Sequence, residues 1–235
     1  MSFRLIRLLF FLLCLLQGST SESLPLQNPN IIVITVDCLR FDRMGIYGYQ
    51  RNTTPSIDVF FKDSARFNQA VSQSSLTSPG IISILTSLYP SVHGMDAKGK
   101  FFDKNFMTPL RQLRDEGYVT LGYDTSQNYA DPGWTKEFKK APPIEVLKKH
   151  RKDKFFAWFH FREPHLPYAP PEPFKSVFFK EPYSISKEKL RLVMESEKIL
   201  KSKIAFEEGD SPAIRDLYDA EVLYQDKVLS ELFEF

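Results

Sequence analysis

The sequence has 235 residues, of which 43% are hydrophobic and 26% charged, and its formal net charge is +2. This composition is that of an ordinary globular protein with enough apolar residues for a buried core, and it excludes extensive disorder. The small net charge gives no indication of a nucleic-acid partner or of binding to an acidic membrane surface.

The N-terminal residues have the features of a secretory signal. Two arginines, Arg4 and Arg7, precede a short apolar run, and small residues follow it. A membrane-spanning helix needs roughly 20 apolar residues, so we expect residues 1–21 to be a cleaved signal peptide, with an uncleaved anchor as the alternative. The protein is then secreted, or periplasmic and part of the cell envelope. Cys38 would be its one remaining cysteine, which excludes an internal disulfide.

Asp37 directly follows the first predicted strand. Residues Ile31 to Val36 are a continuous run rich in β-branched side chains, which is typical of a strand buried on both faces of a parallel sheet. A carboxylate at the carboxyl end of such a strand lies where open α/β sheets bind their ligands. Asp37 is therefore a candidate ligand-binding residue, and the alternative is that it only caps the following turn.

A segment with many hydroxyl side chains, SSLTSPGIISILTSLYPSVHG, contains the next clear helix. Its isoleucines and leucines are spaced for one helix face, and Pro79 suits the first turn, where its missing N–H is not needed. Thr77 and Ser78 then lie at the helix N-terminus. Both are preferred capping residues. The free N–H groups and the dipole of a helix start also favour a bound anion, so both roles stay open for Thr77.

Helices and strands alternate along the rest of the chain. This alternation predicts an α/β fold with a mostly parallel sheet. Strands are predicted over Tyr118–Tyr123 and in DKFFAWFHF. Helices are predicted over Ile57–Ala65, over Thr108–Glu116, within Ser184–Lys203, and from Ser211, as N-cap, to the end of the sequence.

A proline-rich loop, REPHLPYAPPEPF, follows the aromatic strand. Pro164 and Pro167 flank His165 and reduce the entropy that this loop loses when it is ordered. His165 is therefore a candidate ligand contact at the exit of the strand. The alternative is a solvated loop histidine.

Three of these segments, in this order, resemble the N-terminal catalytic part of the sulfatase family within the alkaline phosphatase superfamily. ITVDCLRFDRMGIYGYQRNTTPSID is similar to the family's opening strand, turn and first helix, TSPGIISILTSLYPSVHG to its nucleophile segment, and FAWFHFREPHLPYAPPEPF to its strand and histidine-bearing loop. The resemblance covers nearly all of residues 28–235. It implies one alkaline-phosphatase-like α/β domain with helices on both faces of the sheet.

The resemblance also implies a role for each candidate residue. Asp37 matches a metal-ligand carboxylate, Thr77 matches the metal-bound nucleophile, and His165 matches a histidine that contacts the oxyanion of the substrate. Cys38 stands where many sulfatases have a second Asp, so one ligand of that pair is missing. The implied cofactor is a divalent cation, either calcium, magnesium, manganese or zinc. The implied substrate is a sulfate or phosphate ester.

The nucleophile segment departs from the sulfatases that use formylglycine. In those enzymes this segment resembles Cys-x-Pro-x-Arg, or the same motif with Ser in place of Cys. Here Thr77 occupies the position of the Cys or Ser, and Ile81 occupies the position of the Arg. The difference argues against formylglycine. A threonine hydroxyl held against a divalent cation can still attack phosphorus or sulfur. Superfamily members with threonine here resemble phosphodiesterases, phosphonate hydrolases and phosphoethanolamine or glycerophosphate transferases.

In the family, the remaining metal ligands lie in a segment that resembles Asp-His-Gly or Asp-Asn, beyond the position of the last predicted helix. The sequence contains no match to this segment. We therefore expect a C-terminally incomplete domain whose site is completed by a C-terminal partner fragment. Three functions stay open at this point. They are a hydrolase of sulfuric or phosphoric esters, a truncated non-catalytic remnant or binding protein, and an envelope phospho-group transferase.

Overall fold

The computed structural model describes residues 29–95, 109–124, 137–138, 142–195, 199 and 202–235. The predicted signal peptide, residues 1–21, lies outside this part of the chain. Within it, no helix is both long enough and apolar enough to cross a membrane.

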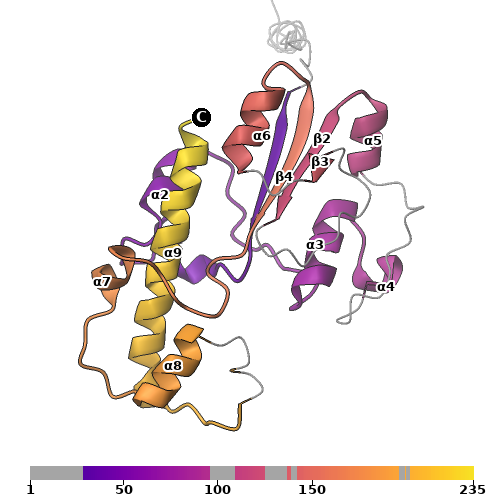
Figure 1. Ribbon diagram of the computed structural model, residues 1–235. Helices are drawn as coiled ribbons and strands as arrows, with labels where there is room; N and C mark the ends of the chain where they lie inside the picture. The colour runs from indigo at the N-terminus through magenta and orange to yellow at the C-terminus, as the bar shows by residue number, and fades with distance from the viewer. Residues whose placement is uncertain (1–28, 96–108, 125–136, 139–141, 196–198, 200–201) are drawn as a thin grey trace, which may run out of the picture.

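A parallel sheet lies at the centre of the molecule (Figure 1), and within the described residues it has four strands in the order β1-β4-β2-β3. These are β1 (Ile31–Val36), β2 (Val119–Asp124), β3 (Glu137–Phe138) and β4 (Phe155–Phe161). All seven residues of β4 are buried, as expected for an apolar strand between two parallel neighbours. β1 has its predicted bounds, and β2 begins and ends one residue later than predicted.

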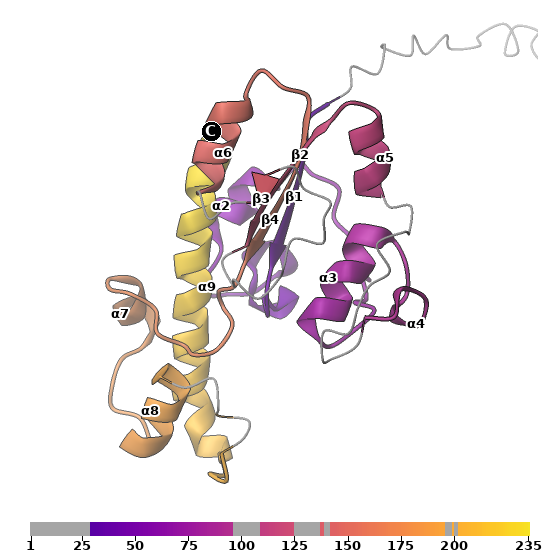
Figure 2. The same ribbon diagram turned by 45° about the vertical axis from the view of Figure 1, so that its right-hand side comes forward.

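One face of the sheet is covered by α2 (Pro55–Phe60), α6 (Pro143–His150) and α9 (Ser211–Phe233), as Figure 2 shows. Successive strand side chains point to opposite faces. The odd-numbered residues of β4 therefore pack on this side, against one or more buried side chains of each helix. This core cluster contains Ile57, Leu121, Val146, Leu147, Phe155, Ala157, Phe159, Phe161 and Leu229.

The other face is covered by α3 (Thr77–Thr86) and α5 (Pro109–Asp115). Phe156 and Trp158 of β4 pack there against Ile81, Ile82, Leu85 and Leu110. The predicted α/β fold with helices on both faces of a mostly parallel sheet is confirmed. A short helix, α4 (Pro90–His93), follows α3 and is tied to it by a 3.0 Å contact between Nε2 of His93 and Oγ of Ser83.

α9 extends beyond the sheet and carries a second layer on its first half. There α7 (Phe174–Phe178) and α8 (Lys187–Glu195) pack against it. The core of this layer contains Phe179, Ile185, Val193, Ala213 and Leu217, contributed by α8, α9 and the loop after α7. A 3-10 turn, η4 (Glu208–Asp210), leads into α9, so Asp210 and not Ser211 occupies the N-cap position.

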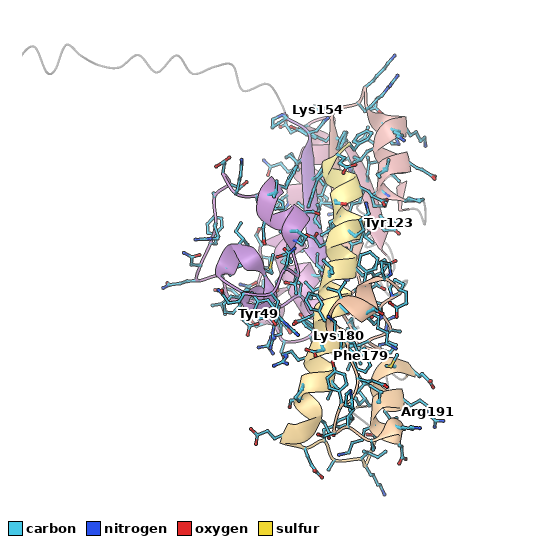
Figure 3. All side chains as sticks on the ribbon, turned by 90° about the vertical axis from the view of Figure 1, so that its left-hand side faces the viewer. Tyr49, Tyr123, Lys154, Phe179, Lys180 and Arg191 are labelled. Atoms are coloured by element: carbon cyan, nitrogen blue, oxygen red, sulfur yellow. The ribbon has the colours of Figure 1, made fainter. Side chains whose placement is uncertain are left out.

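The same helix holds the segment that follows β1, which contains the 3-10 turns η1 (Phe41–Arg43) and η2 (Gly45–Tyr47). Arg51 forms ion pairs of 2.7 Å with Asp216 and 2.5 Å with Asp219, and the hydroxyl of Tyr49 donates a 2.6 Å hydrogen bond to Asp219. Figure 3 shows Tyr49 beside α9 on the side of this N-terminal segment and Phe179 beside it on the side of α7 and α8. α9 therefore joins the sheet, the loop after β1 and the α7–α8 layer.

Candidate active site

Asp37 is held at the carboxyl end of the sheet by its backbone. Its N–H donates a 2.8 Å hydrogen bond to the carbonyl of Phe161, the last residue of β4. This bond continues the parallel pairing of β1 and β4. The carboxylate thus stands at the sheet edge where open α/β folds collect their ligand-binding groups.

Thr77 is the first residue of α3, and its hydroxyl faces Asp37. Its Oγ1 lies 3.3 Å from Oδ2 and 3.4 Å from Oδ1 of that carboxylate. Leu76 occupies the N-cap position and makes no side-chain capping bond, so the capping role that local sequence preferences predict for Thr77 is wrong. The separation from Asp37 is long for a hydrogen bond. It is close to the roughly 3.4 Å that separates two oxygens bound to one tetrahedral cation.

His165 lies in the loop after β4 and makes a hydrogen bond that fixes its ring. Its Nδ1 lies 2.6 Å from the carbonyl oxygen of Leu166, which also accepts a 2.8 Å bond from Nη2 of Arg162. An acceptor at Nδ1 assigns the proton of the neutral ring to that nitrogen. Nε2 then carries the lone pair.

Cys38 turns the chain away from the sheet with a φ of 57°, an uncommon value for a residue other than glycine. Its Sγ lies 3.6 Å from Oδ1 of Asp37. Although the residue is exposed, partial desolvation of the thiol and the charge of Asp37 raise the pKa of Cys38 to about 11, against an opposing effect of Arg162. The hydroxyl of Tyr218, on α9, donates a 2.7 Å hydrogen bond to the Cys38 carbonyl.

The structure brings all three predicted site residues to one end of the sheet and adds a fourth. One ligand atom from each of Asp37, Cys38 and His165 lies within 4.8 Å of the other two, and Thr77 contacts Asp37. The resemblance to sulfatases describes Cys38 only as a replacement for the second Asp ligand of the family. Its position next to Asp37, together with the affinity of thiols for metal ions, was the signal that it could be a donor.

This set of donors fits a divalent cation. It offers a carboxylate oxygen, a sulfur and a ring nitrogen, each a common metal-ligand type. The hydroxyl of Thr77, which contacts the carboxylate of Asp37, offers a further oxygen. The side chains therefore suit the class of cofactor that the sequence predicts.

A family model described as Sulfatase matches residues 29–142, which include Asp37, Cys38 and Thr77. This part of the chain is similar to the sulfatase family. Among curated sulfatases, arylsulfatase D of Homo sapiens is 28% identical over 123 residues, which are 48% of this chain and 21% of that protein.

Solved structures share the fold over a longer stretch of this chain. The phosphonate monoester hydrolase of Agrobacterium radiobacter matches 88% of it with a TM-score of 0.64 and 16% identity. BT4656 in complex with its substrate D-glucosamine-2-N,6-O-disulfate matches 88% with a TM-score of 0.65 and 15% identity. The match spans 58% and 61% of those two chains. The chain thus spans about a fifth of the length of arylsulfatase D and about three fifths of these two structures.

Proposed function

We propose that the chain contributes the nucleophile half of a hydrolase active site for sulfuric or phosphoric esters, with Thr77 as nucleophile. The observation that carries this proposal is the contact of 3.3 Å between the Thr77 hydroxyl and the Asp37 carboxylate at the start of α3. The packing of α3 on the sheet through Ile81, Ile82 and Leu85 holds that hydroxyl in place. A fixed nucleophile needs little further ordering in the transition state.

In the proposed reaction, Oγ1 of Thr77 forms a bond to the phosphorus or sulfur of the ester while the bond to the leaving oxygen breaks. The Thr77 proton passes to water, and the leaving alcohol takes a proton from water. Water then attacks the threonine ester, which releases sulfate from a sulfate ester, a phosphate monoester from a phosphodiester or a phosphonate from a phosphonate monoester, and restores the hydroxyl. Asp37 orients the hydroxyl throughout, and the dipole of α3 favours negative charge on the transferred group. A divalent cation bound by Asp37 and Thr77 would lower the pKa of the hydroxyl and offset the charge of the ester.

The nucleophile segment favours a hydroxyl over formylglycine. Ile81 is 6% exposed and packs in the core beneath α3, so the position that is arginine in the formylglycine motif has a structural role here. The names of the relatives suggest two substrate classes, aryl sulfates and phosphonate monoesters. An unmodified threonine supports phosphorus esters at least as well as sulfate esters.

We also propose that a C-terminal partner fragment supplies the remaining side chains needed for turnover. Support comes from the share of the two solved chains that the match spans, 58% and 61%. The basic and then apolar N-terminal residues support export, through a signal peptide over residues 1–21, to the cell envelope or the medium.

The test is an assay of the purified chain with an aryl sulfate, an aryl phosphodiester and an aryl phosphonate monoester. Each substrate is supplied with zinc, manganese, calcium or magnesium. Because turnover is proposed to need the partner fragment, we expect from the chain alone about one equivalent of aryl alcohol and a single-turnover adduct on the peptide that contains Thr77, detected by mass spectrometry. Thr77→Ala is expected to remove both signals, and Ser75→Ala, which deletes an exposed hydroxyl two residues earlier, is the matched control.

Turnover that survives Thr77→Ala would exclude this residue as the nucleophile. If no substrate gives an alcohol or an adduct with any cation, the chain by itself is a non-catalytic remnant or binding protein. Transfer of the phospho group to an added alcohol in preference to water would identify a transferase.

A further inference from the structure

We propose that Asp37, Cys38 and His165 form a zinc-selective site, with the Cys38 thiolate as a metal ligand. The inference rests on the proposed function for the role of the cation. Its own test measures metal binding and not turnover. In the proposed site, Cys38 is a metal ligand. His165 is also a ligand, and not the substrate contact that the resemblance to the sulfatase family implies.

The geometry brings the three donors within reach of one ion. Each ligand atom lies within 4.8 Å of the other two, and the pair of Cys38 Sγ and Asp37 Oδ1 is at 3.6 Å. Zinc bonds are about 2.3 Å to sulfur and about 2.0–2.2 Å to nitrogen and oxygen, so two ligands of a tetrahedral ion lie roughly 3.4–3.7 Å apart. Small side-chain shifts would therefore close the site around zinc.

The donor types distinguish zinc from calcium and magnesium. Calcium takes six to eight oxygens and magnesium an octahedron of oxygens, whereas thiolate and imidazole ligands suit zinc. Asp37 provides the one carboxylate of the cluster. The negative charges of a thiolate and a carboxylate would together balance the two positive charges of the ion.

Hydrogen bonds outside the cluster hold two of the ligands as a metal site requires. The carbonyl of Leu166 accepts from Nδ1 of His165 at 2.6 Å, which leaves Nε2 to bind the ion. A zinc-bound histidine commonly donates its other N–H in this way. The hydroxyl of Tyr218 donates to the carbonyl of Cys38 at 2.7 Å and fixes the turn that carries the thiol.

Three protein ligands are the usual number for a catalytic zinc, whose fourth position stays open for water or substrate. Thr77 Oγ1 lies 3.3 Å from Oδ2 of Asp37, so the hydroxyl would be close to an ion held by that carboxylate. Binding of the ion therefore needs no residue beyond those of this chain. Because Nε2 of His165 would be a ligand, it would not be the contact to the substrate oxyanion.

The test uses the purified full chain carrying Cys14→Ser, so that Cys38 is its sole thiol. Calorimetry is expected to show one zinc ion per chain, with zinc bound far more tightly than calcium or magnesium. Cobalt is expected to give a sulfur-to-cobalt charge-transfer band in the near ultraviolet. Cys38→Ser should abolish that band and weaken zinc binding by more than the roughly 10–100-fold caused by loss of an outer-shell partner.

Two further variants separate the ligand roles. His165→Ala is expected to weaken zinc binding while the cobalt–sulfur band persists at saturating cobalt, and Cys38→Asp should shift the preference toward calcium and manganese. Unchanged zinc affinity in Cys38→Ser, or a cobalt complex of the parent chain without the sulfur band, would overturn the proposal. Zinc binding by a chain without esterase activity would support it and contradict only the proposed hydrolase.

Discussion

The hydroxyl of Tyr218, in the middle of α9, donates a 2.7 Å hydrogen bond to the carbonyl of Cys38 and accepts one of 2.9 Å from the N–H of Arg40. One side chain of the last helix thus holds both ends of the turn that follows the first strand. Because Asp37 and Cys38 lie on that turn, the geometry of the candidate site depends on α9.

We predict that Tyr218→Phe weakens zinc binding by about 10–100-fold, the effect typical of outer-shell partners of metal ligands. The ring, which packs edge-on against Tyr168 at 5.6 Å, is retained in this variant. Calorimetry with zinc measures the effect, and Tyr168→Phe is the matched control. An affinity loss equal in both variants would assign the effect to general packing and not to the turn.

Asp226 of α9 caps a helix that is distant in sequence. Its carboxylate accepts hydrogen bonds of 3.0 Å from the N–H of Ser56 and 2.9 Å from that of Ile57, in the first turn of α2. The carboxylate is buried, and its removal leaves two donors without a partner. We predict that Asp226→Ala lowers the free energy of unfolding by about 2–3 kcal/mol.

Urea unfolding measures this loss, and hydrogen exchange of the Ile57 amide localises it. Lys227→Ala, at the exposed next position of the same helix, should change stability by no more than about 0.5 kcal/mol. Equal destabilisation in both variants would mean that helix packing, and not the cap, is responsible.

The predictable part of the structure is the part whose signal is local. Ile31–Val36 is a strand with the predicted bounds because its uninterrupted β-branched run favours extended backbone. The predicted burial on both faces is wrong: β1 lies at one end of the described sheet, its residues are only partly buried, and Ile32 is exposed. α2 ends at Phe60, short of the predicted Ala65, where the ring of Phe60 stacks on that of Phe233 at 4.2 Å. A contact with the opposite end of the chain leaves no pattern in the sequence around α2.

The candidate site divides in the same way. Asp37 and His165 were identifiable because each follows a strongly apolar strand, and parallel strands bring their carboxyl ends together. Tyr218 was not identifiable, because it is 180 residues from Cys38 and lies in an ordinary amphipathic helix. Side chains that support a site from another element are visible only in the folded structure.

Removal of one side chain from the ion-pair network of α9 should lower the stability of the fold. Asp219 is fully buried and pairs with Arg51 at 2.5 Å and with Arg43 at 3.7 Å. Loss of Asp219 removes a counter-ion from Arg43 and Arg51, which are 22% and 32% exposed. It also removes an acceptor from the Tyr49 hydroxyl, while Arg51 keeps its pair with Asp216. Asp219→Ala is therefore predicted to destabilise the fold by about 1–3 kcal/mol.

An exposed ion pair provides the control for this network. Asp42 pairs with Arg40 at 2.6 Å, but the two side chains are 42% and 60% exposed. Asp42→Ala should therefore cost less than about 1 kcal/mol. Thermal or urea unfolding of the two variants checks the contrast, and similar losses would show that burial does not govern the contribution of these pairs.

Glu221, also on α9, should make stability depend on pH. It is 3% exposed, and burial together with the nearby charge of Glu163 raises the pKa of Glu221 to about 7, against opposing effects of the Ala169 N–H and Arg162. Between its ordinary value of 4.5 and about 7, the folded state keeps a proton that the unfolded state has released. Stability therefore falls as pH rises through this window, by at most about 1.4 kcal/mol per pH unit.

Glu221→Gln removes this titration while it preserves the size of the side chain. The variant should match the parent chain near pH 4.5 and exceed its stability by up to about 3 kcal/mol above pH 8, where the parent carries the full cost of a buried charge. Urea unfolding from pH 4.5 to 8.5 measures the difference. Glu231→Gln, at an exposed position more than two turns further along the same helix, should leave the pH profile of stability unchanged. A Glu221→Gln profile parallel to that of the parent would show that Glu221 is ionised in the fold without penalty.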